Sequence, residues 1–143
     1  MNPEYILALH TDAKAFGDHQ VVQEYCISIY VGSCHCGSVK FEFDHDEIVS
    51  GLRCNCSICI RKGAIMTAFT LSVDELQIDI ENDSLSTYEF GSSVAKHHFC
   101  KNCGIYTFHQ TMRKPGHYRV NIGCINGIDS TNLPFDVFDG ASL

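Results

Sequence analysis

The chain has 143 residues, of which 45% are apolar, and this is enough for one domain with its own hydrophobic core. Its 10 lysines and arginines against 17 aspartates and glutamates give a formal net charge of −7, which argues against a nucleic-acid-binding surface. No run of about 18 apolar residues suggests a membrane span, and residues 1–20 lack the basic and apolar segments of a secretion signal. We therefore expect a cytoplasmic protein.

The predicted elements are mostly short strands. Residues 25–31 are β-branched and aromatic, and residues 37–43 alternate so that Val39, Phe41 and Phe43 share one face. Turn residues separate most of the later segments, and one helical turn fits within 56–62. Further strands are predicted at 48–53, 64–71, 76–80, 85–90, 94–99, 104–110 and 117–122. The pattern predicts a single, mainly β domain over 1–143, with its core over about 25–133 and a peripheral start and a peripheral tail after Pro134.

Nine cysteines are the most informative feature of the composition. An odd number without a secretion signal argues against a disulfide framework, and Cys34 and Cys36 are too close in sequence for unstrained disulfide geometry. Seven of the nine fall into clusters at residues 34–36, 54–59 and 100–103. In a reducing compartment this spacing is typical of metal ligands.

Two clusters have a glycine directly after their last cysteine, as expected for zinc knuckles, in which glycine lets the backbone turn back toward the thiolate. They are CHCG at 34–37 and CKNCG at 100–104. Together they predict a closed structural zinc site of four sulfurs, Cys34, Cys36, Cys100 and Cys103. The alternatives are that a pair consists of buried free cysteines, or that the four thiolates hold iron.

The middle cluster, CNCSIC, offers only the three sulfurs of Cys54, Cys56 and Cys59. Three protein ligands and one open position are the arrangement of a catalytic zinc, so the fourth ligand can be water or a substrate thiol. Two alternatives stay open: the loop holds no ion, or a histidine closes it as a second structural site. The candidate histidines are His35, His45, His97, His98 and His109.

Two cations follow the middle cluster after one intervening residue, and we expect Arg61 and Lys62 either to bind the carboxylates of an anionic substrate or to be solvated surface residues. Cys26 and Cys124 lie in apolar segments and are predicted to be core residues. Of the pair His97 and His98, strand alternation predicts that only one points inward.

The segments GSCHCGSVKFEF, CNCSICIRKGA, HHFCKNCGIYTF and VNIGC, in this order, resemble the glutathione-dependent formaldehyde-activating enzymes, a family that includes centromere protein V. The resemblance covers about Gly32 to Gly127. It implies a zinc-binding fold of the β-tent type, a structural zinc on the four knuckle cysteines and a second zinc on Cys54, Cys56 and Cys59. The CNCSIC form resembles the centromere-protein-V-like branch.

The family's activity is the condensation of formaldehyde with glutathione to S-(hydroxymethyl)glutathione, a carbon–sulfur lyase reaction in reverse. The resemblance therefore implies a zinc-dependent enzyme whose partner is a small thiol such as glutathione. In that interpretation the second zinc binds the thiol or polarises the aldehyde, and no residue stands out as the proton carrier. The alternative is a non-catalytic zinc module that binds glutathione or a protein partner.

Overall fold

The computed structural model describes residues 5–7 and 26–143 of the chain. These residues form eleven strands, one α-helix and two short 3-10 helices, which confirms the predicted mainly β fold with short strands and little helix. No helix within the described ranges is long and apolar enough to span a membrane. Most of the N-terminal segment that was predicted to be peripheral lies outside the described residues.

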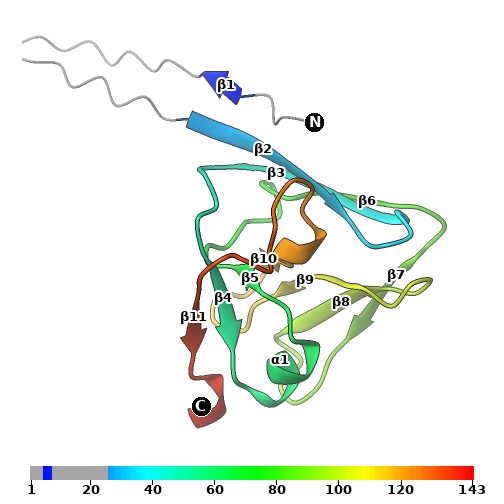
Figure 1. The fold of residues 1–143 in the computed structure, drawn as a ribbon. Coiled ribbons are helices and arrows are strands. Elements are labelled where there is room, and N and C mark those ends of the chain that lie inside the picture. The colour runs from blue at the N-terminus through cyan, green and yellow to red at the C-terminus, as the bar shows by residue number, and fades with distance from the viewer. Residues whose placement is uncertain (1–4, 8–25) are drawn as a thin grey trace, which may run out of the picture.

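The strands form three sheets (Figure 1). The first has the order β1-β2-β3-β6, and its strands are Tyr5–Leu7, Cys26–Ser33, Val39–His45 and Gln77–Ile80. The second has the order β10-β9-β8-β7, with strands Tyr118–Val120, Tyr106–Gln110, Lys96–Cys100 and Leu85–Tyr88. The third has the order β11-β4-β5, with strands Phe135–Phe138, Gly51–Cys54 and Met66–Thr67. Helix α1, Ser57–Lys62, follows β4, and the 3-10 helices η1 and η2 are Ile122–Cys124 and Gly140–Ser142.

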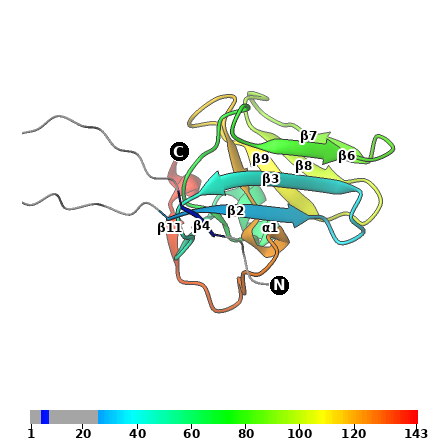
Figure 2. The same ribbon diagram turned by 90° about the horizontal axis from the view of Figure 1, so that it is seen from above.

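The core lies between the first two sheets, which face each other in Figures 1 and 2. The predicted alternation of β3 is confirmed, because Val39, Phe41 and Phe43 are buried while the residues between them are exposed. The Phe41 ring meets Phe108 of β9 edge to face, with centroids 6.3 Å apart. Burial of these large apolar side chains is the main stabilising contribution that holds the two sheets together.

Isolated bridges join the sheets beyond this core. Gly32 of β2 pairs with Ile125 after η1, and Met66 of β5 pairs with Asn121 after β10. A Cβ at position 32 would lie 2.3 Å from the Phe41 ring, so only glycine allows β2 to approach this closely. The bridges place the three cysteine clusters, which are far apart in sequence, on a common scaffold.

The structure differs from the sequence-based expectation in two places. The predicted strand at 64–71 is reduced to Met66–Thr67. The tail after Pro134, predicted to be peripheral, supplies β11, which pairs in parallel with β4 so that Phe138 lies opposite Cys54.

Candidate metal centres

The four knuckle cysteines come together as the glycine pattern predicted. Cys34 and Cys36 lie in the turn between β2 and β3, whereas Cys100 ends β8 and Cys103 lies in the turn before β9. Gly37 and Gly104 both have positive φ, 83° and 77°, a conformation that glycine adopts without strain. The N–H of Gly104 bonds to the carbonyl of Cys100 at 2.9 Å, which closes the second knuckle.

The spacing of these four sulfurs fits a tetrahedral ion. All four lie within 4.8 Å of one another, and Cys36 Sγ is 3.6 Å from both Cys34 Sγ and Cys100 Sγ. A zinc–sulfur bond of about 2.3 Å requires sulfurs about 3.8 Å apart at the corners of a tetrahedron. The cluster is therefore already close to the arrangement that a structural zinc needs.

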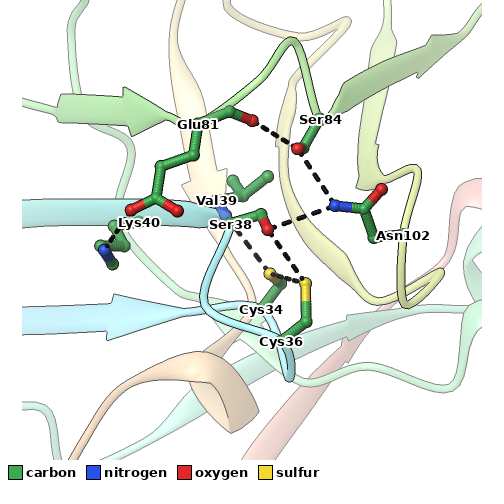
Figure 3. A network of polar contacts seen from close by, with 8 residues as sticks. All are labelled: Cys34, Cys36, Ser38, Val39, Lys40, Glu81, Ser84 and Asn102. Carbon is green, nitrogen blue, oxygen red and sulfur yellow. Dashed lines mark hydrogen bonds and ion pairs between the residues drawn. The ribbon is translucent and has the colours of Figure 1, made fainter.

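Hydrogen bonds orient the first knuckle and tie it to the second (Figure 3). The N–H of Val39 donates to Cys34 Sγ at 3.3 Å, and the Ser38 hydroxyl lies 3.4 Å from Cys36 Sγ. Asn102, from the second knuckle, donates to the hydroxyls of Ser38 and Ser84, each at 3.2 Å. Such contacts fix the thiolates in position before an ion binds.

The thiols of this cluster differ in acidity. The Ser38 hydroxyl is the main cause that lowers the pKa of Cys36 to about 6. Burial raises the pKa of Cys100 to about 11. A buried thiolate at Cys100 therefore needs a cation beside it, which is what a zinc ion in this cluster provides.

The three-cysteine site is built differently, from one continuous loop. Cys54 ends β4, Cys56 caps α1, and Cys59 lies within the helix. Their sulfurs lie within 4.8 Å of one another, and the N–H of Cys56 points at Cys54 Sγ from 3.4 Å. Burial raises the pKa of Cys59 to about 12, so this thiolate too requires a nearby positive charge.

No histidine, aspartate or glutamate in the described ranges joins these three sulfurs within 4.8 Å. The histidines considered as a fourth ligand therefore do not close this site. His98 is buried against Phe108 and Tyr118, with its Nδ1 2.8 Å from the Thr87 hydroxyl. The geometry agrees with an ion that has three protein ligands and one open position.

A cavity of about 400 Å³ opens beside the three cysteines, all of which line it. Four of the chain's ten lysines and arginines also line it, whereas the lining includes no aspartate or glutamate from the described residues. The four cations are Arg53, Lys62, Arg113 and Arg119. In a chain with a net charge of −7, this concentration of positive charge favours an anionic ligand.

Lys62 and His97, which line the cavity, are joined through the Tyr106 hydroxyl in a partly buried chain of hydrogen bonds. Lys62 Nζ donates to the Tyr106 hydroxyl at 2.6 Å, and that hydroxyl lies 3.0 Å from His97 Nδ1. Since an ammonium group only donates, the Tyr106 proton goes to His97 Nδ1, and a neutral His97 then carries its own proton on Nε2. Nε2 has no partner within the part of the chain that the structure describes.

Burial is the main cause of the pKa shifts in this hydrogen-bonded chain. It lowers the pKa of His97 to about 4, with Lys62 adding to the effect, and it raises the pKa of Tyr106 well above the usual value. Burial also lowers the pKa of Lys62, although the neighbouring cysteines, first of all Cys59, act in the opposite direction. At neutral pH His97 is uncharged, so the cavity's positive charge comes from its lysine and arginines.

Several other predicted residues can now be placed. Lys62 lines the cavity, but Arg61 is exposed and its Nη1 donates to the Ser57 carbonyl of its own helix at 2.6 Å. Cys124 is buried as predicted. The prediction for Cys26 was wrong, because this cysteine is exposed at the start of β2, where its side chain lies outside the core.

Sequence reasoning missed the other contributors to the cavity. Arg119 comes from the second sheet and Arg113 from the turn after β9, both more than fifty residues beyond the three-cysteine loop. Tyr106, also from the second sheet, bonds to the lining residues Lys62 and His97. No local pattern marks them. The sequence offers one indirect signal, which is that Arg113 and Arg119 have no aspartate or glutamate next to them that could pair with their charge.

Comparison with known proteins agrees with this geometry. The family model described as "glutathione-dependent formaldehyde-activating enzyme" matches residues 29–138. A crystal structure of a Rhodobacter sphaeroides protein, a structural-genomics target, is similar with a TM-score of 0.66 and 36% sequence identity. The similarity covers 74% of this chain and 99% of that one. The chain belongs to the glutathione-dependent formaldehyde-activating enzyme family.

Proposed function

We propose that the protein is a zinc-dependent enzyme that joins a glutathione-like thiol to formaldehyde in the cavity beside Cys54, Cys56 and Cys59. The observation that carries the proposal is the lining of this cavity, which combines three cysteine sulfurs with four cationic side chains and no aspartate or glutamate from the described residues. Glutathione is anionic and carries a thiol, and both features have a counterpart in the lining. We expect one further zinc on the four knuckle cysteines, and a cytoplasmic location.

An ion at the three-cysteine site would supply a Lewis acid and would lower the pKa of a thiol that reaches its open position. The chain's own residues would balance the charge of the thiolates and bind the carboxylates of the substrate. Lys62, with its ammonium group held against the Tyr106 hydroxyl, offsets the negative charge of the cysteine thiolates. The guanidinium of Arg113 lies 4.2 Å above the Phe138 ring and is well placed to hold a carboxylate.

The reaction is an addition without oxidation or reduction. The S–H bond of the thiol breaks, a C–S bond forms to the aldehyde carbon, and the aldehyde oxygen takes up the proton as a hydroxyl. The Nε2–H of His97 supports a role as hydrogen-bond donor to that oxygen, because His97 lines the cavity and Nε2 has no partner among the described residues. Removing such a preorganised donor typically slows a reaction by about a hundredfold or more.

Exchange NMR tests the proposal, because it reports how fast formaldehyde and glutathione interconvert with S-(hydroxymethyl)glutathione at equilibrium. The fully zinc-loaded protein is expected to accelerate the exchange above the rate in buffer. The Cys56→Ser variant is expected to leave the buffer rate unchanged. An Arg61→Ala variant serves as a matched control, since Arg61 does not line the cavity.

A loaded protein that gives only the buffer rate would overturn the enzymatic proposal. If the same sample still bound glutathione, the second interpretation, a non-catalytic zinc module, would replace it. The two outcomes are separated by following glutathione line widths in the same NMR sample without formaldehyde.

A further inference from the structure

The chain after β11 folds back against the three-cysteine loop. Strand β11 pairs with β4 up to Phe138, which lies opposite Cys54. The next residue, Asp139, leads into η2, Gly140–Ser142. The segment Asp139–Ser142, which we call the C-terminal clamp, thus lies directly beside the cysteines that belong to the proposed zinc site.

Gly140 shows how close this contact is. A Cβ at position 140 would lie 2.5 Å from Cys54 Sγ and 3.1 Å from Cys56 Cβ. Gly140 is not among the described glycines that have positive φ, so its backbone conformation does not require glycine. The space required by the sulfur is what excludes a side chain here. The clamp backbone therefore covers one side of Cys54 and Cys56.

Asn55, between these two cysteines, holds the clamp with both ends of its side chain. Its Nδ2 donates to Asp139 Oδ1 at 2.9 Å, and its Oδ1 accepts from the N–H of Ala141 at 2.8 Å. Its own backbone N–H donates to the Phe138 carbonyl at 3.1 Å. The second carboxylate oxygen of Asp139 accepts from the Ser142 hydroxyl at 2.6 Å, which fixes the clamp internally.

We propose that Asn55 is a positioning residue that, through the C-terminal clamp, fixes Cys54 and Cys56 for metal binding and shields them from solvent on one side. This inference rests on the proposed function, in that it requires a zinc ion on the three cysteines. With the clamp in place, protein backbone covers part of Cys54 and Cys56, and Gly140 of the clamp forms part of the wall of the cavity that the three cysteines line. The clamp thus slows the loss of the ion while the substrate side stays accessible.

The test uses the full chain loaded with two zinc ions and follows zinc transfer to a colorimetric chelator. The wild type should release zinc in two phases, a faster one from the three-cysteine site and a slower one from the four-cysteine site. In Asn55→Ala the fast phase should accelerate by roughly tenfold to a hundredfold, the usual effect of losing a group that orients metal ligands. The slow phase and the thermal unfolding midpoint should stay close to those of the wild type.

A charge-swap variant separates positioning from general destabilisation. Asn55→Asp alone places two carboxylates together and should accelerate the fast phase as Asn55→Ala does. Asn55→Asp combined with Asp139→Asn restores a donor–acceptor pair between the two positions and leaves acceptors for the Ala141 N–H and the Ser142 hydroxyl. The double variant should return to within about threefold of the wild type, since the remaining hydrogen bonds are of ordinary strength.

Two further variants complete the design. Gly140→Ala disturbs the same contact without changing Asn55, so it is informative even if the Asn55 variants fail to fold. Asn132→Ala removes an asparagine–aspartate bond of 2.6 Å to Asp129 in another turn and should change neither phase. An unchanged fast phase in folded Asn55→Ala and Gly140→Ala, or an equal acceleration of both phases, would overturn the inference. A wild type that binds only one zinc would instead refute the proposed function itself, and the inference with it.

Discussion

The two cysteine clusters hold sulfurs at similar distances, but they are built in opposite ways. The four-cysteine cluster joins two knuckles that come from different sheets and are far apart in sequence, and Cys34 and Cys100 within it are buried. The three-cysteine cluster comes from one loop and one helical turn, and its sulfurs are partly exposed beside a cavity. A closed cluster that links distant segments stabilises the fold, whereas a cluster on one loop can present an ion to a ligand.

The strongest test of this contrast is Cys100→Ser. Binding of a structural zinc is worth on the order of 10 kcal/mol of apparent free energy at neutral pH, which is comparable to the entire stability of a domain. Because Cys100 lies at the end of β8 and is fully buried, we expect the variant to lose both the zinc and the fold. Circular dichroism and metal analysis measure both effects.

Cys26→Ser is the matched control for this substitution, because Cys26 is exposed and belongs to neither cluster. It should bind two zinc ions and unfold at the wild-type temperature. A folded Cys100→Ser protein would show instead that the two sheets hold together without the four-cysteine site.

The next largest effect is expected for Cys56→Ser. This variant should lose one of two zinc ions and keep its fold, since the three cysteines and their loop connect no distant segments through the metal. Metal stoichiometry and the denaturant midpoint measure the two consequences separately. If the variant unfolded like Cys100→Ser, both clusters would be structural and the contrast between them would be lost.

A smaller effect is expected from the cations around the cavity. Arg113→Ala should weaken glutathione binding roughly tenfold or more, because a hydrogen bond to a charged group contributes about 1.5–3 kcal/mol. Arg61→Ala should change it little, since the Arg61 guanidinium bonds to its own helix. Titration calorimetry with glutathione gives both dissociation constants. Equal losses in the two variants would favour general attraction by charge over a specific carboxylate contact.

The metal-binding clusters could be predicted from sequence because their cysteines lie close together in the sequence at spacings typical of metal ligands. Cysteine spacing identifies the three groups, and glycine after Cys36 and Cys103 identifies which two belong together. The alternation of Val39, Phe41 and Phe43 likewise predicts the buried face of β3. In each case the chemistry of neighbouring residues is sufficient.

The cavity could not be predicted in the same way, because its lining depends on tertiary contacts. Arg113 and Arg119 reach it only through the arrangement of the second sheet, and Gly140 reaches it only through the parallel pairing of β11 with β4. A parallel pairing between segments more than eighty residues apart has no local sequence signal. The prediction that the tail is peripheral overlooked this pairing for that reason.

The histidine pair shows where a correct local rule gives a wrong conclusion. Strand alternation predicts opposite directions for His97 and His98, and they do face different neighbours: His97 contacts Tyr106, and His98 contacts Phe108 and Tyr118. The conclusion that only one would be buried is wrong, because both are, at 5% and 7% exposure. The rule assumes one solvated face, and β8 is covered on both.

This burial leads to the smallest expected effect, a change in how stability depends on pH. Burial lowers the pKa of His97 to about 4, whereas an unfolded chain has a histidine pKa near 6.5, so between these values the unfolded state binds the extra proton. Stability contributed by neutral His97 is therefore fully present above about pH 6.5 and falls as the pH drops toward 4. Between pH 7.5 and 5.5 the loss is on the order of 1 kcal/mol.

His97→Gln removes this proton uptake and keeps a polar side chain at the position. Denaturant unfolding at pH 7.5 and 5.5 gives the loss of unfolding free energy over this interval for the zinc-loaded wild type and variant. Acid also weakens zinc binding by the cysteines, but this contribution is the same in both proteins and cancels when their losses are compared. The wild type should lose more stability than the variant over this interval. Parallel losses would mean that His97 takes up its proton over the same pH interval in the folded protein as in the unfolded chain, and that burial does not keep the ring neutral below about pH 6.5.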